Sequence, residues 1–235
     1  MPYVQANGIN IFYEVHGSGR PLLIIPGLSI DLTALEGLVT EFSKDRRVIT
    51  FDNRGAGRTD KPDEPYTIDM MADDAFALLE TLDLRSPDVM GLSLGGRIAL
   101  SLATRHPSSV RSLILASTGP RVQRTLRRRL FFVLVEVPRR VGALLKKYPQ
   151  PYYAYRRQLR ASEGYDATLA LGGISVPTLV LHGRKDAVSP YSLAVEMQEK
   201  IPGAKLVTLA GGHLYPLWHP KEFATTVEGF LDATP

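Results

Sequence analysis

The sequence predicts an α/β fold in which helices cover both faces of a mostly parallel sheet. From residue 21 onward, short and almost wholly apolar runs alternate with segments of helical periodicity. Strands that are apolar on both sides are typical of parallel sheets enclosed between two layers of helices. The apolar runs are about 5–8 residues long, whereas a membrane-spanning helix needs roughly 20. The pattern therefore predicts a soluble protein with no integral membrane segment.

The strands are predicted from these apolar runs. The first two are expected to form a hairpin at Asn7-Gly8, because this dipeptide suits a turn in which both residues have positive φ. The hairpin should add an antiparallel start at one edge of the parallel sheet. The eight predicted strands are residues 3–8, 10–17, 21–27, 46–52, 87–93, 110–118, 176–183 and 204–212.

Two helix starts can be predicted from their capping residues. Thr67 is expected as the N-cap of a helix over residues 67–84, since its hydroxyl can accept an unpaired N–H of the first turn. Ser189 is expected as the N-cap of a helix over residues 190–202, which would begin with a proline. Both helices follow apolar strands, as the α/β prediction requires.

The alternation is interrupted once, between the sixth and seventh strands. The interrupting segment should contain two or three short helices divided at Pro138 and Pro149. It leaves from the carboxyl end of a strand, which is where parallel sheets bind their ligands. We therefore expect a small helical lid at residues 119–169. The core is predicted to comprise residues 1–118 and 170–235.

The predicted lid is strongly basic. Residues 119–164 carry twelve Lys or Arg against two acids, although the whole chain has a net charge of only +4. Its apolar run at residues 130–137 has the material to line an acyl or alcohol pocket. One interpretation of the basic face is that it recruits anionic substrates or makes weak contact with anionic lipid. We favour the other interpretation, a solvated surface on which the stems of Lys and Arg cover apolar area. Nucleic-acid binding is not expected, because no binding motif accompanies the charge.

A serine between glycines ends the fifth predicted strand. In the run Gly91-Leu92-Ser93-Leu94-Gly95, the glycines remove side chains that would collide at a tight turn from strand to helix. Such a turn exposes a hydroxyl and is known as a nucleophile elbow. The alternative is a helix N-cap serine beside packing glycines. A nucleophilic serine further requires a base to take its proton and an acid to orient the base.

The base and the acid are predicted from their positions after later strands. His213 follows the last strand in a glycine-rich loop at the carboxyl end of the sheet. His219 starts the last helix, His106 ends a helix at the opposite end of the sheet, and His182 is expected to pack at its strand end. After the sixth strand there is no carboxylate, so Asp186 after the seventh is expected to orient the base. The order serine, aspartate, histidine suits this architecture.

An oxyanion hole needs two N–H donors fixed in advance. One should be the backbone N–H of Leu94, the residue after the proposed nucleophile. The other is expected from the loop after the third strand, at Leu28. Both residues would donate through the backbone, so their side chains are not constrained by this role.

These motifs resemble those of the α/β-hydrolase fold family, in particular its esterase, lactonase and haloperoxidase-like group. The resemblance spans nearly the whole chain and rests on "PGLS", "FDNRGAGRTDKP", "GLSLGG", "GRKDAVSP" and "GGHLYPLWHPKEF". It implies an eight-stranded sheet with the lid inserted after strand six. It also implies that Asp52 and Arg54 organise turns. Two departures are Pro26 where relatives commonly have histidine, and His219 where a glutamate is common.

The resemblance implies a serine hydrolase of carboxylic esters or lactones of small to medium size. Dehalogenases and epoxide hydrolases of this fold use aspartate at the elbow, which Ser93 excludes. Cofactor-free haloperoxidase or perhydrolase activity, carbon–carbon bond hydrolysis, and a non-enzymatic role as a small-molecule receptor or signalling protein remain alternatives. No metal or organic cofactor is expected. The absence of cysteine excludes disulfides. No secretory signal is found, so a cytoplasmic location is predicted. The protein is expected to be a monomer or a homodimer.

Overall fold

The computed structural model describes residues 2–130 and 147–234. Its centre is an eight-stranded sheet with the strand order β1-β2-β4-β3-β5-β6-β7-β8. The pairs β1–β2 and β2–β4 are antiparallel, and all other neighbouring pairs are parallel. The strands are β1 Tyr3–Ala6, β2 Ile9–His16, β3 Arg20–Ile25, β4 Arg46–Phe51, β5 Asp88–Leu92, β6 Ser112–Ala116, β7 Thr178–Gly183 and β8 Lys205–Leu209.

The turn between β1 and β2 has the geometry that its sequence predicts. Asn7 has φ of 47° and Gly8 has φ of 78°, so both turn residues lie in the left-handed region that an Asn-Gly pair tolerates. The hairpin places Ala6 opposite Ile9. The antiparallel strands lie at one edge of the sheet, as expected.

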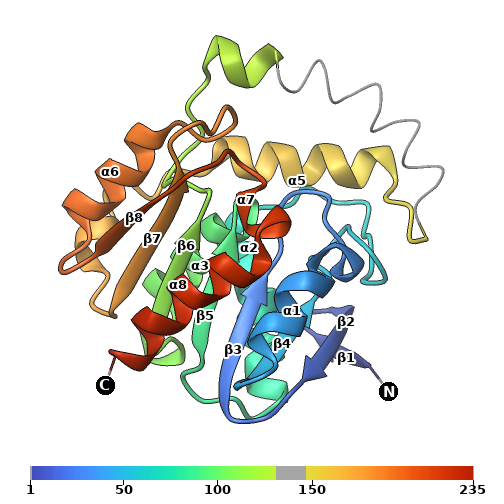
Figure 1. Ribbon diagram of the computed structural model, residues 1–235. Coiled ribbons are helices and arrows are strands. Elements are labelled where there is room, and N and C mark those ends of the chain that lie inside the picture. The colour runs from blue at the N-terminus through green and yellow to red at the C-terminus, as the bar shows by residue number, and fades with distance from the viewer. Residues whose placement is uncertain (1, 131–146, 235) are drawn as a thin grey trace.

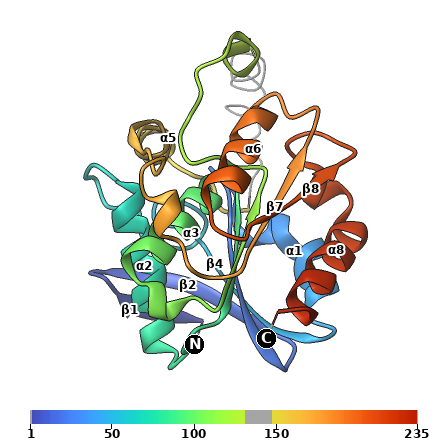
Figure 2. The same ribbon diagram turned by 90° about the vertical axis from the view of Figure 1, so that its left-hand side faces the viewer.

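Helices cover both faces of the sheet. In Figure 2, α2 and α3 lie on one side of the strands, and α1 and α8 lie on the other. The segments lie at η1 Leu32–Leu35, α1 Glu36–Phe42, α2 Ile68–Thr81, α3 Leu94–Arg105, η2 Pro107–Ser109, α5 Tyr152–Gly164, η3 Leu171–Gly173, α6 Tyr191–Lys200, α7 Tyr215–Trp218 and α8 Pro220–Asp232.

Two hydrophobic clusters fill the space between the sheet and its helices. Successive side chains of a strand point to opposite faces, so β3 contributes to both clusters. Leu23 and Ile25 belong to the cluster that includes residues of α2, α3 and α6, while Leu22 and Ile24 belong to the cluster that includes residues of α1 and α8. All four side chains are completely buried. This burial on both faces explains why the strands carry continuous apolar runs.

One of the two predicted N-caps is present. The Thr67 hydroxyl accepts the backbone N–H of Met70 at 3.0 Å, which begins α2 as expected. The prediction for Ser189 is wrong, because Pro190 occupies the cap position of α6 and makes no side-chain cap. The backbone N–H of Ser189 instead donates to the carboxylate of Asp186. This bond fixes Ser189 in the preceding turn.

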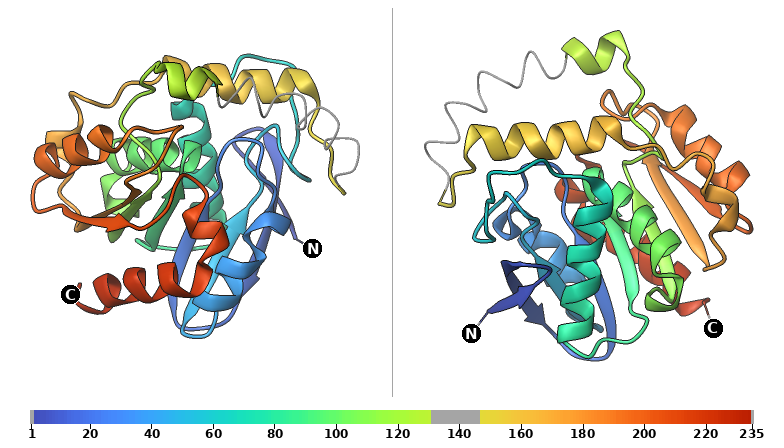
Figure 3. Two further views of the ribbon diagram at one scale, coloured as in Figure 1. Left: turned by 45° about the horizontal axis from the view of Figure 1, so that its top comes forward. Right: turned by 180° about the vertical axis from the view of Figure 1, so that it is seen from behind.

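The segment between β6 and β7 crosses the carboxyl ends of the parallel strands. Its helix α5 passes over the strand tips in Figures 1 and 3. Gln158 of α5 is completely buried and donates to the backbone carbonyl of Arg54 at 2.8 Å. The predicted helix break at Pro138 and most of the apolar run 130–137 lie outside the described residues. Within the described part of the chain, none of the helices has the length and apolar character needed to cross a membrane.

Candidate active site

Ser93 lies in a strained turn between β5 and α3. Its φ of 55° and ψ of −111° place it far from the conformations that a serine prefers. The neighbouring contacts hold it there, because its N–H donates to the carbonyl of Ala116 and its own carbonyl accepts the Thr118 hydroxyl. Ser93 thus precedes the first turn of α3 with its side chain free of any capping bond.

The flanking glycines are required by close backbone approach. A Cβ on Gly91 would collide with the carbonyl of Gly95, and a Cβ on Gly95 would collide with the carbonyl of Ile25. Neither obstacle is a flexible side chain, so neither can move away at low cost. The strand, the turn and the helix approach one another closely only because both positions lack a side chain.

Three of the predicted residues form a continuous hydrogen-bonded chain. The Nδ1 atom of His213 lies 2.8 Å from Oδ2 of Asp186, and its Nε2 atom lies 2.9 Å from Oγ of Ser93. A carboxylate only accepts, so Nδ1 carries the proton and Nε2 of the neutral ring accepts the Ser93 hydroxyl proton. His213 is therefore placed to remove a proton from Ser93.

Asp186 is held by the turn that contains it. Its Oδ1 atom accepts the backbone N–H groups of Val188 and Ser189, each at 2.8 Å. Its side chain is completely buried, and Oδ2 is left to face His213. The carboxylate is thus fixed on one side by the backbone and on the other by the imidazole.

His182 is a further part of this arrangement, which the sequence did not reveal. Its Nε2 atom donates to the carbonyl of Ser189 at 2.7 Å and lies 3.4 Å from Oδ2 of Asp186. Burial lowers the pKa of His182, so the ring is neutral near pH 7. It packs at its strand end as expected, but it also contacts the carboxylate that orients His213. The signal in the sequence was its position four residues before Asp186.

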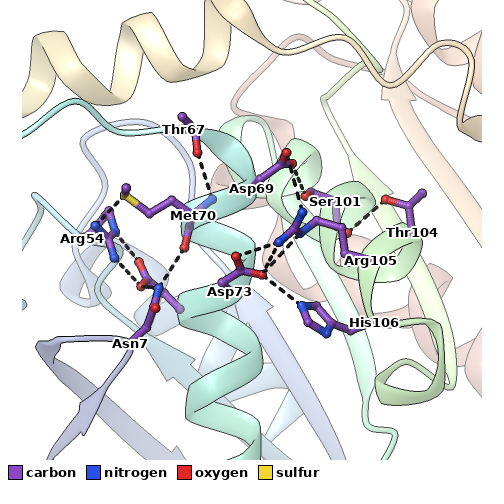
Figure 4. A network of polar contacts seen from close by, with 11 residues as sticks. Asn7, Arg54, Thr67, Asp69, Met70, Asp73, Ser101, Thr104, Arg105 and His106 are labelled. Atoms are coloured by element: carbon purple, nitrogen blue, oxygen red, sulfur yellow. Dashed lines mark hydrogen bonds and ion pairs between the residues drawn. The ribbon is translucent and has the colours of Figure 1, made fainter.

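The other histidines lie elsewhere. His106 caps the end of α3, roughly 17 Å from its start. Figure 4 shows it beside Asp73, with His106 Nε2 3.0 Å from Asp73 Oδ1, in a network that also contains Arg105. His219 is exposed at the N-cap position of α8 and stacks on Tyr215 with ring centroids 4.5 Å apart. Both positions agree with the predicted structural roles.

The two predicted oxyanion donors border one cavity. Leu94 is the first residue of α3, so its N–H has no acceptor inside the helix. Leu28 belongs to the loop after β3, and both residues line a cavity together with Ser93 and His213. The loop is held from above, since the N–H of the next residue, Ser29, donates to Gln158 of α5 at 3.1 Å.

Asp52 and Arg54 support the loops around the site. Asp52 is buried and accepts the backbone N–H groups of Leu32 and Arg58, at 2.9 and 2.8 Å. It therefore joins the loop after β3 to the loop after β4. Arg54 forms a buried ion pair with Asp74 through two hydrogen bonds of 2.5 and 2.6 Å. These contacts fit the expected structural role of both residues.

Two small cavities flank the Ser93–His213 pair, and their chemistry differs. One has a volume of about 20 Å³ and is lined mainly by apolar side chains, including Ile30 and Leu217. The other has a volume of about 30 Å³ and includes Arg97 and Arg128. Each is about large enough for a water molecule. Among residues 2–130 and 147–234, no group of three or more acidic, histidine or cysteine side chains suits a metal ion.

The arrangement described above is the α/β-hydrolase fold, with an elbow serine, a histidine and an aspartate placed in the order that this fold carries. Residues 20–170 match the family model for the alpha/beta hydrolase fold, and residues 157–222 match a model described as TAP-like protein. The first match covers more than half of the chain. The protein therefore belongs to the α/β-hydrolase family.

Similar proteins support the assignment along the full chain. The AB hydrolase superfamily protein YisY of Bacillus subtilis is 30% identical over 87% of this chain and 89% of its own length. A putative carbamate hydrolase, RutD of Rhizobium rhizogenes, is 30% identical over 94% of this chain and 97% of its own length. The crystal structure of an enol-lactonase from Burkholderia xenovorans is 26% identical, with a TM-score of 0.84 over 98% of this chain and 100% of the other.

Proposed function

We propose that this protein is a serine hydrolase that cleaves carboxylic esters or lactones of small to medium size. The observation that carries the proposal is the unbroken relay from Asp186 through His213 to Ser93, with heavy-atom distances of 2.8 and 2.9 Å. A relay of this geometry activates a hydroxyl for attack on an acyl group. The similarity to an enol-lactonase supports a lactone or ester as substrate.

The first half of the proposed reaction forms an acyl-enzyme. His213 takes the Ser93 proton on Nε2 while Oγ attacks the carbonyl carbon of the substrate. The negative charge that develops on the carbonyl oxygen is stabilised by the N–H groups of Leu28 and Leu94, aided by the N-terminus of α3. As the carbon–oxygen bond breaks, the leaving alkoxide takes the proton from His213 and departs as an alcohol.

The second half returns the enzyme to its starting state. A water molecule gives a proton to His213 and attacks the acyl carbon, and the resulting intermediate releases Ser93 with that proton. Asp186 stabilises the imidazolium in both halves without being protonated itself. For a lactone, the alcohol and the acid are two ends of one product. The cycle uses only groups of the chain and water.

We also propose that residues 119–169 act as a lid that shapes the substrate pocket. Leu159 and Ser162 of α5 and Val122 line the same cavity as Ser93. The shared cavity supports a lid role for the described parts of this segment. The length and polarity of the acyl chain that fits would then depend on this segment.

The test is hydrolysis of p-nitrophenyl esters from acetate to palmitate by the wild type, Ser93→Ala and the exposed control Ser18→Ala. We expect activity to peak at one chain length and to fall roughly 10⁴-fold or more in Ser93→Ala, while Ser18→Ala matches the wild type. A fluorophosphonate should label Ser93, as mass spectrometry of the labelled peptide would show.

Wild-type activity no greater than that of Ser93→Ala on esters and lactones would reject the proposal. The similarity to a putative carbamate hydrolase makes carbamates the next substrates to assay. A small ligand that raises the melting temperature and remains unhydrolysed would point instead to a receptor.

A further inference from the structure

The cavity that borders Leu28 and Leu94 contains a buried cation that has no acidic partner among the described residues. Arg97 lies one turn after Ser93 on α3, and only 7% of its surface is exposed. Within residues 2–130 and 147–234, no carboxylate forms an ion pair with it. Arg128, which lines the same cavity, has its own acid at 3.3 Å in Glu163.

The hydrogen bonds of Arg97 leave part of its guanidinium group unsatisfied. Nη1 donates to the hydroxyl of Ser162 at 3.1 Å, and Nη2 donates to the carbonyl of Arg121 at 3.2 Å. The Nε atom is buried and has no acceptor. Burial lowers the pKa of Arg97 to about 10, and the charge of Arg128 acts in the same direction. The group therefore remains protonated at neutral pH.

Burying a guanidinium group in this way reduces the free energy of unfolding. Two neutral acceptors do not compensate a buried full charge, and a lone N–H without water or acceptor adds to the cost. A carboxylate would remove both penalties, because guanidinium groups bind carboxylates through two parallel hydrogen bonds. The unsatisfied Nε–H and the adjacent Nη groups form one edge of such a site.

The position of Arg97 ties this site to the reacting groups. Residues four apart on a helix share a face, and helical side chains lean toward the N-terminus, so Arg97 leans toward Ser93. One turn corresponds to roughly 6 Å along the axis. Arg97, Ser93 and His213 line the same cavity, whereas the cavity on the other side of the pair is apolar. A group bound at Arg97 would therefore share this cavity with Ser93 and His213.

We propose that Arg97 is a specificity-determining residue that binds a carboxylate carried by the substrate, so that the preferred ester or lactone is an anion. This inference rests on the proposed hydrolase function and specifies its substrate class. The carboxylate lies a few bonds from the reacting carbonyl, as in the monoester of a short dicarboxylic acid. The apolar cavity accepts the uncharged part of the same molecule.

The first test compares matched anionic and neutral esters. One pair is p-nitrophenyl hydrogen glutarate and p-nitrophenyl methyl glutarate, with the charge on the acyl side. The other pair is para-acetoxybenzoate and para-acetoxybenzamide, with the charge on the alcohol side. In at least one pair we expect kcat/KM to favour the anion in the wild type. Replacing Arg97 with Met should lower that ratio about 10- to 100-fold. Arg97→Lys should retain part of it, and the exposed control Arg124→Gln should keep it in full.

The ratio is measured on one preparation, so partial loss of folded protein cancels. Equal rates within both pairs for the wild type would overturn the inference. So would an anion preference that survives in Arg97→Met.

The second test does not depend on turnover. In a Ser93→Ala background, monomethyl glutarate should raise the melting temperature by several degrees, and dimethyl glutarate should have a smaller effect. Adding Arg97→Met should abolish the difference between the two ligands. If the wild type hydrolyses no ester but this difference is present, the proposed function fails while the anion site stands. If the two ligands raise the melting temperature equally both in Ser93→Ala and in Ser93→Ala with Arg97→Met, the anion site is overturned.

A third readout separates recognition from a purely structural role. If Arg97 were structural, Arg97→Met would lower the melting temperature of the ligand-free protein. Because it removes an uncompensated buried charge, we expect that temperature to stay the same or to rise. A clear fall, together with an unchanged anion-to-neutral ratio, would assign Arg97 to the fold.

Discussion

Two buried arginines in this protein differ in whether an acidic side chain pairs with them. Arg54 is 3% exposed and meets the carboxylate of Asp74 through two hydrogen bonds, at 2.5 and 2.6 Å. Burial alone would lower the pKa of Arg54, but the hydrogen bonds and charge of Asp74 outweigh it and raise the pKa. Arg97 is 7% exposed and, in the part of the chain that the structure describes, donates only to a hydroxyl and a carbonyl. The paired arginine stabilises loops, and the unpaired one lies in the cavity beside Ser93.

The comparison teaches that burial of a charge does not by itself indicate its purpose. A buried charge that pairs with another side chain of the protein has a structural role. A buried charge that lacks such a partner and faces a cavity is available to bind a ligand. His182 shows a third outcome. It lies against the buried carboxylate of Asp186, yet burial lowers its pKa and keeps it neutral.

The largest effect should follow from breaking the paired site. Arg54→Met would leave Asp74 buried without its cation, which costs about 3–5 kcal/mol of folding free energy. Urea unfolding would measure the loss. The double variant Arg54→Met with Asp74→Leu should recover most of it, because both charges are then absent. A single variant as stable as the wild type would show that the ion pair is dispensable, and the contrast with Arg97 would disappear.

A smaller effect should follow from giving Arg97 a partner. Ser162→Asp would place a carboxylate where Arg97 now has a hydroxyl, so that the site resembles that of Arg54. We expect the protein to gain about 2 kcal/mol, a typical value for a charge-assisted hydrogen bond, and to lose its preference for anionic esters. Ser162→Asn supplies a side chain of the same size without the charge and serves as the control. Increased anion preference in Ser162→Asp would contradict the assignment of Arg97.

The smallest effect concerns His182. Its pKa is lowered in the folded state, so as the pH falls below about 6.5 the unfolded chain takes up a proton that the folded chain does not. The stability contribution is complete above that pH and is lost as the pH falls toward the folded pKa, with a slope of at most about 1.4 kcal/mol per pH unit. His182→Gln keeps an N–H donor for the carbonyl of Ser189 but does not titrate.

Denaturant unfolding at pH 7 and at lower pH values would measure this effect. The wild type should lose more stability than His182→Gln over that interval. Identical losses would contradict the prediction, because they would show that His182 takes up its proton equally in the folded and unfolded states.

Much of the fold follows from local patterns. The continuous apolar strands predicted the parallel sheet, and Asn7-Gly8 predicted the edge hairpin, because both depend on neighbouring residues alone. The elbow glycines predicted where Ser93 would lie, and the geometry now brings Ser93, His213 and Asp186 within hydrogen-bonding distance of one another. Ser189 was misassigned because the carboxylate of Asp186 holds its backbone N–H in the preceding turn, so that Pro190 takes the cap position of α6.

The environment of Arg97 could not be predicted from local sequence patterns. In the sequence it is one cation at the start of an amphipathic helix. Its burial depends on contacts with Ser162 and Arg121, which are far away along the chain. Its spacing of four residues from Ser93 was the available signal. The absence of a carboxylate partner becomes visible only when the surroundings are known.

The buried side chain of Gln158 has a consequence for engineering. It accepts the N–H groups of Ser29 and of the Gln150 amide and donates to the carbonyl of Arg54. One residue of α5 therefore joins the loop after β3, the loop after β4 and the segment that precedes its own helix. A chimera that imports the β6–β7 segment of a relative to change the substrate range would have to import or rebuild this amide. Without it, the exchange would alter the loop after β3 along with the cavity beside Ser93.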